Sequence, residues 1–269
     1  MNLLKGKKGI ITGALNAQSI AWKVAEAAIA EGAEIVLTNT ALSIRMGEIR
    51  QLAEKYGCKL IAADATNVEE LEALVDGAME HFGGKFDFVL HSIGMSPNVR
   101  KRKPYEDIDY ALMNKTMDIS ALSFHKLLQT LYKKDALNDW GSVVALTYIA
   151  AERAFTGYND MADAKALLQS ITRNFGVIYG SRNHVRINTV SQSPTATTAG
   201  QGIEGMKDML DYADKMSPLG NASAEDCANY VITLFSDYTK KVTMQNLYHD
   251  GGFSTTGLTP AALEYIKGE

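Results

Sequence analysis

Short apolar runs alternate with amphipathic segments along the whole chain. The apolar runs are bounded by turn residues, which is typical of buried β-strands. They occupy residues 9–12, 34–38, 59–63, 86–91, 141–147, 185–190 and 246–250. Between them, segments such as 19–31 and 68–82 carry apolar residues at spacings of three and four, which predicts helices with one buried face.

This alternation predicts the fold class. Strands this apolar are covered on both faces, and strands that alternate with crossover helices form a mostly parallel sheet. We therefore expect an α/β fold, a doubly wound parallel sheet of about seven strands. No linker, repeat or low-complexity tract interrupts the pattern, so we expect a single domain over residues 1–269, with an irregular insertion at 191–216 before the last helix.

Composition and charge exclude several functional classes. The chain has 46% hydrophobic and 22% charged residues, and its formal charge is 27 − 31 = −4 with no basic tail, which argues against a nucleic-acid partner. Cys58 and Cys227 have neither close spacing nor a His cluster beside them, so we expect no disulfide framework and no metal site. No segment approaches the roughly 18 apolar residues of a membrane helix, and the N-terminus does not resemble a signal peptide. We expect a cytoplasmic protein.

The residues that follow the strands are candidate ligand contacts, because doubly wound sheets bind ligands outside the carboxyl ends of their strands. Gly13 would allow a tight turn and Ser19 could cap the next helix and aim its amides at a pyrophosphate, but an ordinary strand-to-helix turn is an equal alternative. Asp64 could bind an adenine amino group or cap a helix. Gly94 would allow close backbone approach to a ligand, whereas we interpret His91 as a buried structural residue.

A tyrosine and a lysine stand seven residues apart in the stretch YNDMADAK. Seven helical residues turn through about 700°, nearly two full turns, so Tyr158 and Lys165 would share one helical face about 10.5 Å apart. The lysine charge would also favour the phenolate form of the tyrosine. Tyr148 follows a strand directly and is predicted to face the same crevice, while Ala145 stands where many nicotinamide reductases have a serine.

Together these segments resemble a known family. The run YIAAERAFTGYNDMADAK, with TGALNAQSIAW, HSIGMSP, VRINTVSQSPTATTAG and HDGGFS, is similar to the bacterial enoyl-acyl carrier protein reductases, a divergent branch of the short-chain dehydrogenase/reductase superfamily. The resemblance covers essentially the whole chain. It implies a Rossmann-type sheet, a homotetramer, and reduction of the trans-2 double bond of an enoyl thioester on acyl carrier protein by NADH or NADPH, the last step of fatty-acid elongation.

The resemblance also implies roles for individual residues. Tyr158 would donate a hydrogen bond or proton to the thioester oxygen, Lys165 would hold the nicotinamide ribose, and Tyr148 would position the enoyl chain. The implied cofactor contacts, besides Lys165, are Gly13, Ser19, Ile20, Thr40, Asp64, Ala65, Ile93, Gly94, Thr195 and Thr197. The implied substrate contacts, besides Tyr148, are Ser96, Met161, Ile203 and Met206, the last two in the insertion that would cover the substrate.

Some alternatives stay open at this level. NADH is the cofactor that we favour. No acidic residue follows the second strand to exclude a 2′-phosphate, and Arg45 could pair with one or simply be solvated, so NADPH remains an alternative. A carbonyl (3-ketoacyl) reductase and a catalytically dead dinucleotide-binding regulator are the other candidate functions. The basic run from Arg100 to Lys103 could attract an acidic carrier protein or be an ordinary solvated loop.

Overall fold

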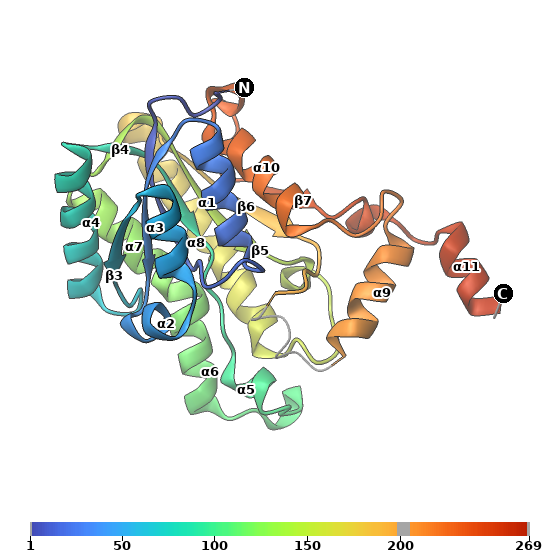
Figure 1. The fold of residues 1–269 in the computed structure, drawn as a ribbon. Coiled ribbons are helices and arrows are strands. Elements are labelled where there is room, and N and C mark those ends of the chain that lie inside the picture. Colours follow the sequence, from blue (N-terminus) through green and yellow to red (C-terminus); the bar gives the residue numbers. More distant parts are fainter. Residues whose placement is uncertain (1, 198–204, 268–269) are drawn as a thin grey trace.

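All seven predicted strands lie in one parallel sheet, which confirms the predicted α/β Rossmann-type fold. The computed structural model describes residues 2–197 and 205–267. The strand order is β3-β2-β1-β4-β5-β6-β7 (Figure 1). The strands are β1 (Lys8–Thr12), β2 (Glu34–Asn39), β3 (Lys59–Ala62), β4 (Phe86–His91), β5 (Leu137–Thr147), β6 (Arg186–Gln192) and β7 (Asn246–His249).

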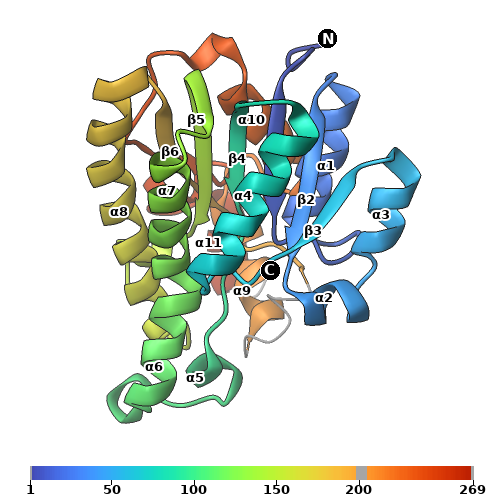
Figure 2. The same ribbon diagram turned by 90° about the vertical axis from the view of Figure 1, so that its left-hand side faces the viewer.

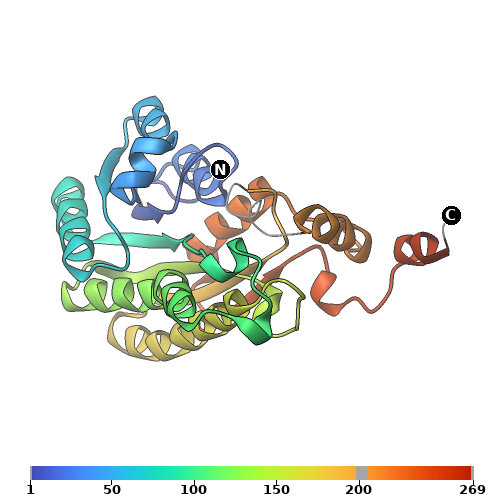
Figure 3. The ribbon, with the colours of Figure 1, turned by 90° about the horizontal axis from the view of Figure 1, so that it is seen from below.

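Helices cover both faces of the sheet, as Figures 2 and 3 show. One apolar core joins the sheet to α4, α7 and α8, and the other joins it to α1, α3 and α10. The α-helices are α1 (Ile20–Ala30), α2 (Ala41–Met46), α3 (Ile49–Tyr56), α4 (Val68–Phe82), α5 (Pro97–Arg100), α6 (Tyr110–Met117), α7 (Ser123–Lys133), α8 (Asp160–Asn183), α9 (Met206–Met216), α10 (Ala224–Phe235) and α11 (Pro260–Lys267). Single turns are η1 (Tyr105–Asp107), η3 (Ile149–Ala151), η5 (Asp237–Thr239) and η6 (Phe253–Thr255), and the π-helical turn η2 (Asp118–Leu122) joins α6 to α7.

The strand order reverses between β1 and β4, and the backbone is closely packed there. Gly13 ends β1 with a φ of +85°, and a Cβ on it would lie 2.0 Å from the carbonyl oxygen of Ser92, directly after β4. Only glycine fits this contact. In an open α/β sheet this reversal is where a crevice forms at the carboxyl ends of the strands.

The segment 191–216 is more regular than the sequence predicted. Strand β6 continues to Gln192, and α9 occupies Met206–Met216, so both ends of the segment are regular. Two helices, α10 and α11, follow it instead of one. Helices α9 and α11 pack on each other and project from the body of the molecule (Figures 1 and 3).

Strand β5 also begins earlier than predicted, at Leu137 instead of Gly141. Leu137 pairs with Phe86, but the next pairing joins Ser142 to Phe88, so the register shifts in between. Trp140 lies in this irregular stretch with a φ of +63°. The apolar run that predicted the strand therefore marks only the part after the irregularity.

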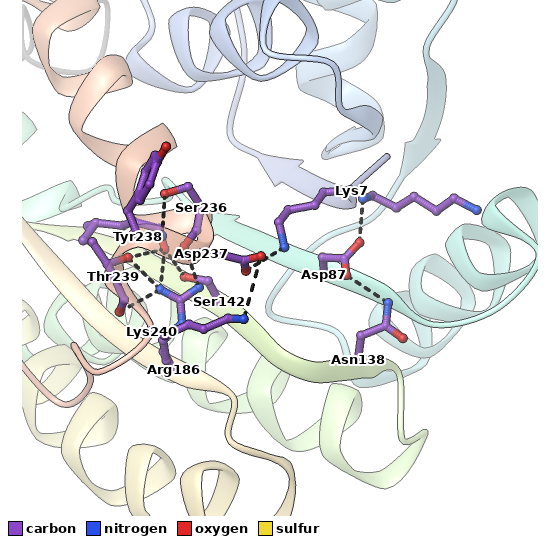
Figure 4. Close-up of polar contacts among 12 residues, drawn as sticks. Lys7, Asp87, Asn138, Ser142, Arg186, Ser236, Asp237, Tyr238, Thr239 and Lys240 are labelled. Carbon is purple, nitrogen blue, oxygen red and sulfur yellow. Dashed lines mark hydrogen bonds and ion pairs between the residues drawn. The ribbon is translucent and has the colours of Figure 1, made fainter. Parts of the chain in front are cut away.

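At the opposite end of the sheet, a buried arginine anchors α10 (Figure 4). Arg186 begins β6 and is 2% exposed. Its guanidinium donates hydrogen bonds to the carbonyl oxygens of Leu234, at 2.9 Å, and Ser236, at 3.3 Å, and to the hydroxyl of Thr239, at 2.7 Å. These bonds satisfy carbonyls at the end of the helix that an α-helix leaves without internal partners.

We expect Arg186→Leu to destabilise the protein by roughly 2–4 kcal/mol, because it removes several charge-assisted hydrogen bonds from buried carbonyls. Arg182→Leu is the matched control. Arg182 lies at the surface, where it bonds Asp135 at 2.9 Å, and such surface pairs contribute less than about 1 kcal/mol. Urea unfolding at equal protein concentration measures both, and equal losses would contradict the anchoring role.

Candidate active site

A continuous cleft runs along the carboxyl ends of the strands. It has two parts, which we name by characteristic side chains: the polar part, over β1, β2 and β3, includes Asn39, Thr40 and Asp64, and the apolar part, over β4, β5 and β6, includes Tyr148, Tyr158 and several methionines. The residues that line both parts are Ile20, Ser92, Ile93, Gly94, Met95, Arg100 and Thr197. Every predicted site residue within the described part of the chain lines one part or the other, whereas Ile203 lies outside the described residues.

The first turn of α1 faces the polar part of the cleft. Ser19 occupies the N-cap position, but its side chain makes no capping bond to the helix. Its hydroxyl instead accepts hydrogen bonds from the amides of Leu15 and Asn16, both at 3.0 Å, and so closes the turn after β1. The helix start, with its positive dipole end, therefore has no capping side chain and suits an anion such as a pyrophosphate.

The far end of the polar part is lined by short polar side chains. Thr40 caps α2 by accepting a hydrogen bond from the amide of Ser43 at 3.2 Å. Asp64 accepts from the amide and the hydroxyl of Thr66, at 2.9 and 2.8 Å, which forms a tight turn. Asn67, and not Asp64, is the N-cap of α4, so the helix-capping alternative for Asp64 is wrong. Arg45 is exposed and does not line the cleft.

Gly94 and Lys165 meet where the two parts of the cleft join. A Cβ on Gly94 would lie 2.7 Å from Cε of Met161 and 3.5 Å from Nζ of Lys165, so backbone and side chains are in close contact. Lys165 is 7% exposed and donates a hydrogen bond to the carbonyl oxygen of Leu146 at 2.8 Å. Burial lowers its pKa to about 8. An ammonium has three donors, so two remain for ligand hydroxyls.

Tyr148 and Tyr158 lie side by side in the apolar part. Their ring centroids are 5.1 Å apart, and both rings are buried. Burial raises the pKa of Tyr158 above its usual range, and it is also the main cause of the raised pKa of Tyr148. The expectation that Lys165 favours the phenolate of Tyr158 is therefore wrong for this site. A neutral phenol is the form that can donate a hydrogen bond.

The helical relation predicted between Tyr158 and Lys165 is also wrong, although both residues face the cleft. Helix α8 begins at Asp160, and Asn159 before it has φ 45° and ψ −136°. Tyr158 thus lies outside the helix, in the preceding turn. Tertiary packing of this turn brings its ring into the cleft, and no shared helical face is involved.

His91 has the structural role that the sequence indicated. It is fully buried at the end of β4, where a ring nitrogen lies 2.9 Å from the hydroxyl of Ser123 and the ring packs against Phe124. Burial, with a smaller contribution from the Lys165 charge, lowers its pKa to about 3. His91 is therefore neutral at physiological pH.

Four methionine side chains contribute to the lining of the apolar part. Met161 and Met206 were expected there, whereas Met95 and Met209 were missed by the sequence reasoning. Met209 follows Met206 by one helical turn of α9, and this spacing was the signal that could have identified it. Unbranched thioether side chains adapt to apolar ligands of varied shape.

Ser96 lines the cleft, but its hydroxyl is already engaged. It donates a hydrogen bond to Asp160 at 2.6 Å and accepts one from the amide of Val99 at 3.0 Å. The hydroxyl is thus held by contacts within the protein, and the substrate contact expected at Ser96 stays a prediction. Sequence reasoning missed Asp160 because no local pattern marks a buried carboxylate.

The segment after β6 closes one side of the cleft. Thr195 donates a hydrogen bond to the carbonyl oxygen of Ser193 at 3.0 Å. Asn221, which precedes α10, donates to the carbonyl oxygen of Pro194 at 2.8 Å. Gln192, at the end of β6, accepts a hydrogen bond at Oε1 from Nδ1 of His249 at 2.7 Å. These bonds tie residues 192–195 to neighbouring elements and hold this wall in place.

Three buried hydroxyls of the cleft have no hydrogen-bond partner among residues 2–197 and 205–267. They belong to Thr38, Thr147 and Tyr148. Buried polar groups are normally satisfied, so such atoms indicate where polar groups of a ligand fit. Together with the close approaches at Gly13 and Gly94 and the first turn of α1, they suit a dinucleotide lying along the cleft with its reactive end near Lys165.

In the described part of the chain, no helix is long and apolar enough to cross a membrane. Within the same residues, no group of three or more His, Cys, Asp or Glu side chains could hold a metal ion.

Comparisons with known proteins agree with this geometry. The family model of enoyl-(acyl carrier protein) reductase matches residues 13–254. The chain is 34% identical over 259 residues to an enoyl-[acyl-carrier-protein] reductase [NADH] of Rhizobium meliloti, covering 95% of this chain and 94% of the relative. It is 70% identical to the chain of a FabI–NADH complex from Alistipes finegoldii, with a TM-score of 0.96 over 97% of this chain and 93% of that one.

A more distant solved structure carries the other nicotinamide cofactor. The Bacillus cereus enoyl-acyl carrier protein reductase, in complex with NADP⁺ and indole naphthyridinone, is 27% identical and has a TM-score of 0.89. The alignment covers 96% of this chain and 100% of that one. Proteins of this fold and family thus bind either cofactor.

The buried Lys165 should make stability depend on pH. Its pKa of about 8 in the folded protein lies below the ordinary lysine value of 10.5, so between these pH values the unfolded chain binds more protons and stability rises with pH. Lys165→Met removes the buried charge, so we expect it to gain stability relative to the wild type at pH 7. This gain in the free energy of unfolding should be smaller at pH 10, by up to about 3 kcal/mol. Urea unfolding at both pH values measures this, and a constant difference would contradict it.

Proposed function

The chain belongs to the enoyl-(acyl carrier protein) reductase family, and we propose that it reduces the trans-2 double bond of an enoyl thioester carried on acyl carrier protein. This reaction is the last step of each fatty-acid elongation cycle. The observation that carries the proposal is that Tyr148, Tyr158 and Lys165 all line the apolar part of the cleft, in which the two tyrosine rings pack on each other and Lys165 lies beside Gly94.

The cofactor that fits the cleft would supply a hydride to C3 of the enoyl thioester. The electron pair of the double bond then moves toward the thioester oxygen as an enolate, and C2 takes up a proton. The neutral phenol of Tyr158 donates a hydrogen bond to that oxygen as its charge develops. Lys165 keeps two donors for ribose hydroxyls, and Tyr148, whose ring packs on Tyr158, positions the acyl chain.

NADH is the proposed cofactor. Relatives of this chain are named for NADH, and the 70% identical chain is that of an NADH complex. Arg45, the candidate partner for a 2′-phosphate, does not line the cleft. The side chain of Thr40 is engaged in capping α2. Thr40 directly follows β2, and the adenosine ribose of a dinucleotide lies near the end of this strand.

The competing functions have less support. A carbonyl reductase of the wider superfamily would want a serine at 145, but this position is an alanine buried within β5, and residue 162 is an alanine instead of a lysine. A catalytically dead regulator would not need Tyr148, Tyr158 and Lys165 together at one point of the cleft.

We also propose a cytoplasmic homotetramer. Helix α11 projects from the body of the molecule (Figure 1) and exposes Leu263, Tyr265 and Ile266, which suits contact with another copy. Helix α9, whose Met206 and Met209 line the apolar part, is the proposed cover over the acyl chain. Light scattering on the purified protein would measure the assembly.

Tyr158→Phe should lower kcat for crotonyl and longer enoyl thioesters by about 10²-fold or more, because the developing oxyanion loses its donor. The dissociation constant for NADH should stay unchanged. Tyr179→Phe is the matched control, since Tyr179 lies on α8 away from the cleft and donates to the carbonyl oxygen of Leu128. The loss of NADH or NADPH absorbance, followed in parallel assays, gives kcat for the wild type, Tyr158→Phe and Tyr179→Phe.

Several outcomes of that assay would contradict the proposal. Wild-type turnover of β-ketoacyl thioesters alone would support the carbonyl reductase, and turnover of neither substrate would support the regulator. Full activity of Tyr158→Phe would show that another group donates to the oxyanion. Faster turnover with NADPH than with NADH would overturn the cofactor assignment.

The basic run at the cleft mouth is the proposed docking point for acyl carrier protein. Arg100 lines both parts of the cleft, and Lys101 and Arg102 beside it are exposed. Carrier protein is acidic, so positive charges here would speed productive encounter.

Lys101→Glu with Lys103→Glu should raise KM for carrier-linked enoyl substrates by roughly 3- to 10-fold, because charge reversal at an interface slows association. KM for the coenzyme A thioester should hardly change. Lys59→Glu, which reverses an exposed charge at the start of β3, is the control. An equal rise in KM for both substrates would refute docking at this run.

A further inference from the structure

A buried carboxylate lies directly behind the tyrosine turn. Asp160 begins α8 and has no exposed surface. Its side chain accepts hydrogen bonds from the hydroxyls of Ser96, at 2.6 Å, and Thr116, at 2.8 Å, and from the amide nitrogen of Asn98 at 2.9 Å. In the described part of the chain these partners are neutral donors, and no ion pair includes Asp160. Such burial of a charge is tolerated because all three bonds are charge-assisted.

This carboxylate joins the two walls of the apolar part of the cleft. One wall is the segment 94–100, which lines the cleft through residues that include Val99 and Arg100. The other begins at Tyr158 and continues to Lys165. Asp160, Asn98 and Thr116 do not line the cleft themselves, so the bonds lie behind the surface that a substrate would touch.

The turn at the start of the second wall is under backbone strain. Asn159 has a φ of 45°, which is unfavourable for a residue with a side chain, and it directly links Tyr158 to Asp160. Its side-chain amide also donates to the carbonyl oxygen of Lys103, just beyond the opposite wall. Strained residues persist only where surrounding contacts hold them. The bonds of Asp160 and Asn159 supply such contacts on either side of the turn.

We propose that Asp160 is a positioning residue that sets the placement of Tyr158 opposite the segment 94–100, and thereby the fit of the enoyl thioester. The proposal rests on the proposed reductase function. The cluster of Asp160, Ser96, Asn98 and Thr116 should therefore be needed for full kcat/KM with the enoyl substrate. The cluster acts on the tyrosine end of the cleft and leaves the adenine end, over β2 and β3, unchanged.

The gentlest test removes one donor from behind the wall. We expect Thr116→Val to lower kcat/KM by roughly 3- to 10-fold when the rate is normalised to the concentration of NADH-binding sites. Small misplacements of reacting groups reduce rates strongly. Thr172→Val is the matched control. Thr172 is a similarly buried threonine of α8 whose hydroxyl donates to the carbonyl oxygen of Leu168 and forms no hydrogen bond with a carboxylate of the described residues, whereas the Thr116 hydroxyl lies 3.1 Å from the carbonyl oxygen of Leu112 and 2.8 Å from Asp160. The control should keep wild-type kcat/KM.

A double-mutant cycle identifies the carboxylate as the shared element. Asp160→Asn presents an amide to groups that are donors themselves, so we expect kcat/KM to fall by about 10- to 100-fold. The double variant with Thr116→Val should be no worse than Asp160→Asn alone, because both changes act on the same bonds. The dissociation constant for NADH should change less than about threefold in each variant.

Hydrogen exchange provides a readout that does not depend on turnover. Amides of residues 96–104 should exchange faster in Thr116→Val and Asp160→Asn than in the wild type or in Thr172→Val, because the wall opens more readily. Unchanged exchange, or faster exchange with wild-type kcat/KM per site, would overturn the positioning role. A wild-type protein that reduces no enoyl thioester would instead refute the proposed function itself.

Discussion

The contact between the backbone after β1 and the backbone after β4 is the constraint on which the cleft depends. Gly13 lies so close to the Ser92 carbonyl that no side chain fits between them. This contact brings the first turn of α1 beside the segment that begins with Ile93 and Gly94, and these residues line both parts of the cleft. Because all seven strands are parallel, each of their carboxyl ends reaches this same edge, and every loop that follows a strand can contribute to one binding surface.

Burial changes the acid–base properties of the central side chains in opposite directions. It raises the pKa of Tyr158 and lowers that of Lys165, since each group loses hydration of its charged form. Tyr158 therefore stays protonated and suits hydrogen-bond donation to an oxyanion. Lys165 keeps a charge that is costly without a ligand, and ribose hydroxyls would offer its free donors new partners. Both effects fit a site that is completed by its cofactor.

The walls of the cleft have different mechanical properties. The acyl side is lined by methionines, which adapt their shape easily. The side behind Tyr158 is held by Asp160 and three neutral donors, and such a fully satisfied polar network is rigid. A pliable pocket for the chain and a fixed position for the tyrosine are compatible demands, because the acyl chain varies in length whereas the reacting carbons and oxygen always have the same geometry.

The sequence by itself determined the parallel sheet, the strand ends that line the cleft and the family, because hydrophobic periodicity and local turn residues are short-range properties. Gly13, Gly94, Tyr148, Tyr158 and Lys165 could all be placed at the cleft from their positions beside strands or within motifs. Only the tertiary structure decided that Tyr158 precedes its helix, that burial and not Lys165 controls its pKa, and that the Ser96 hydroxyl serves Asp160. Each of these depends on contacts between residues far apart in the chain, such as the 64 positions that separate Ser96 from Asp160, and no local pattern encodes them.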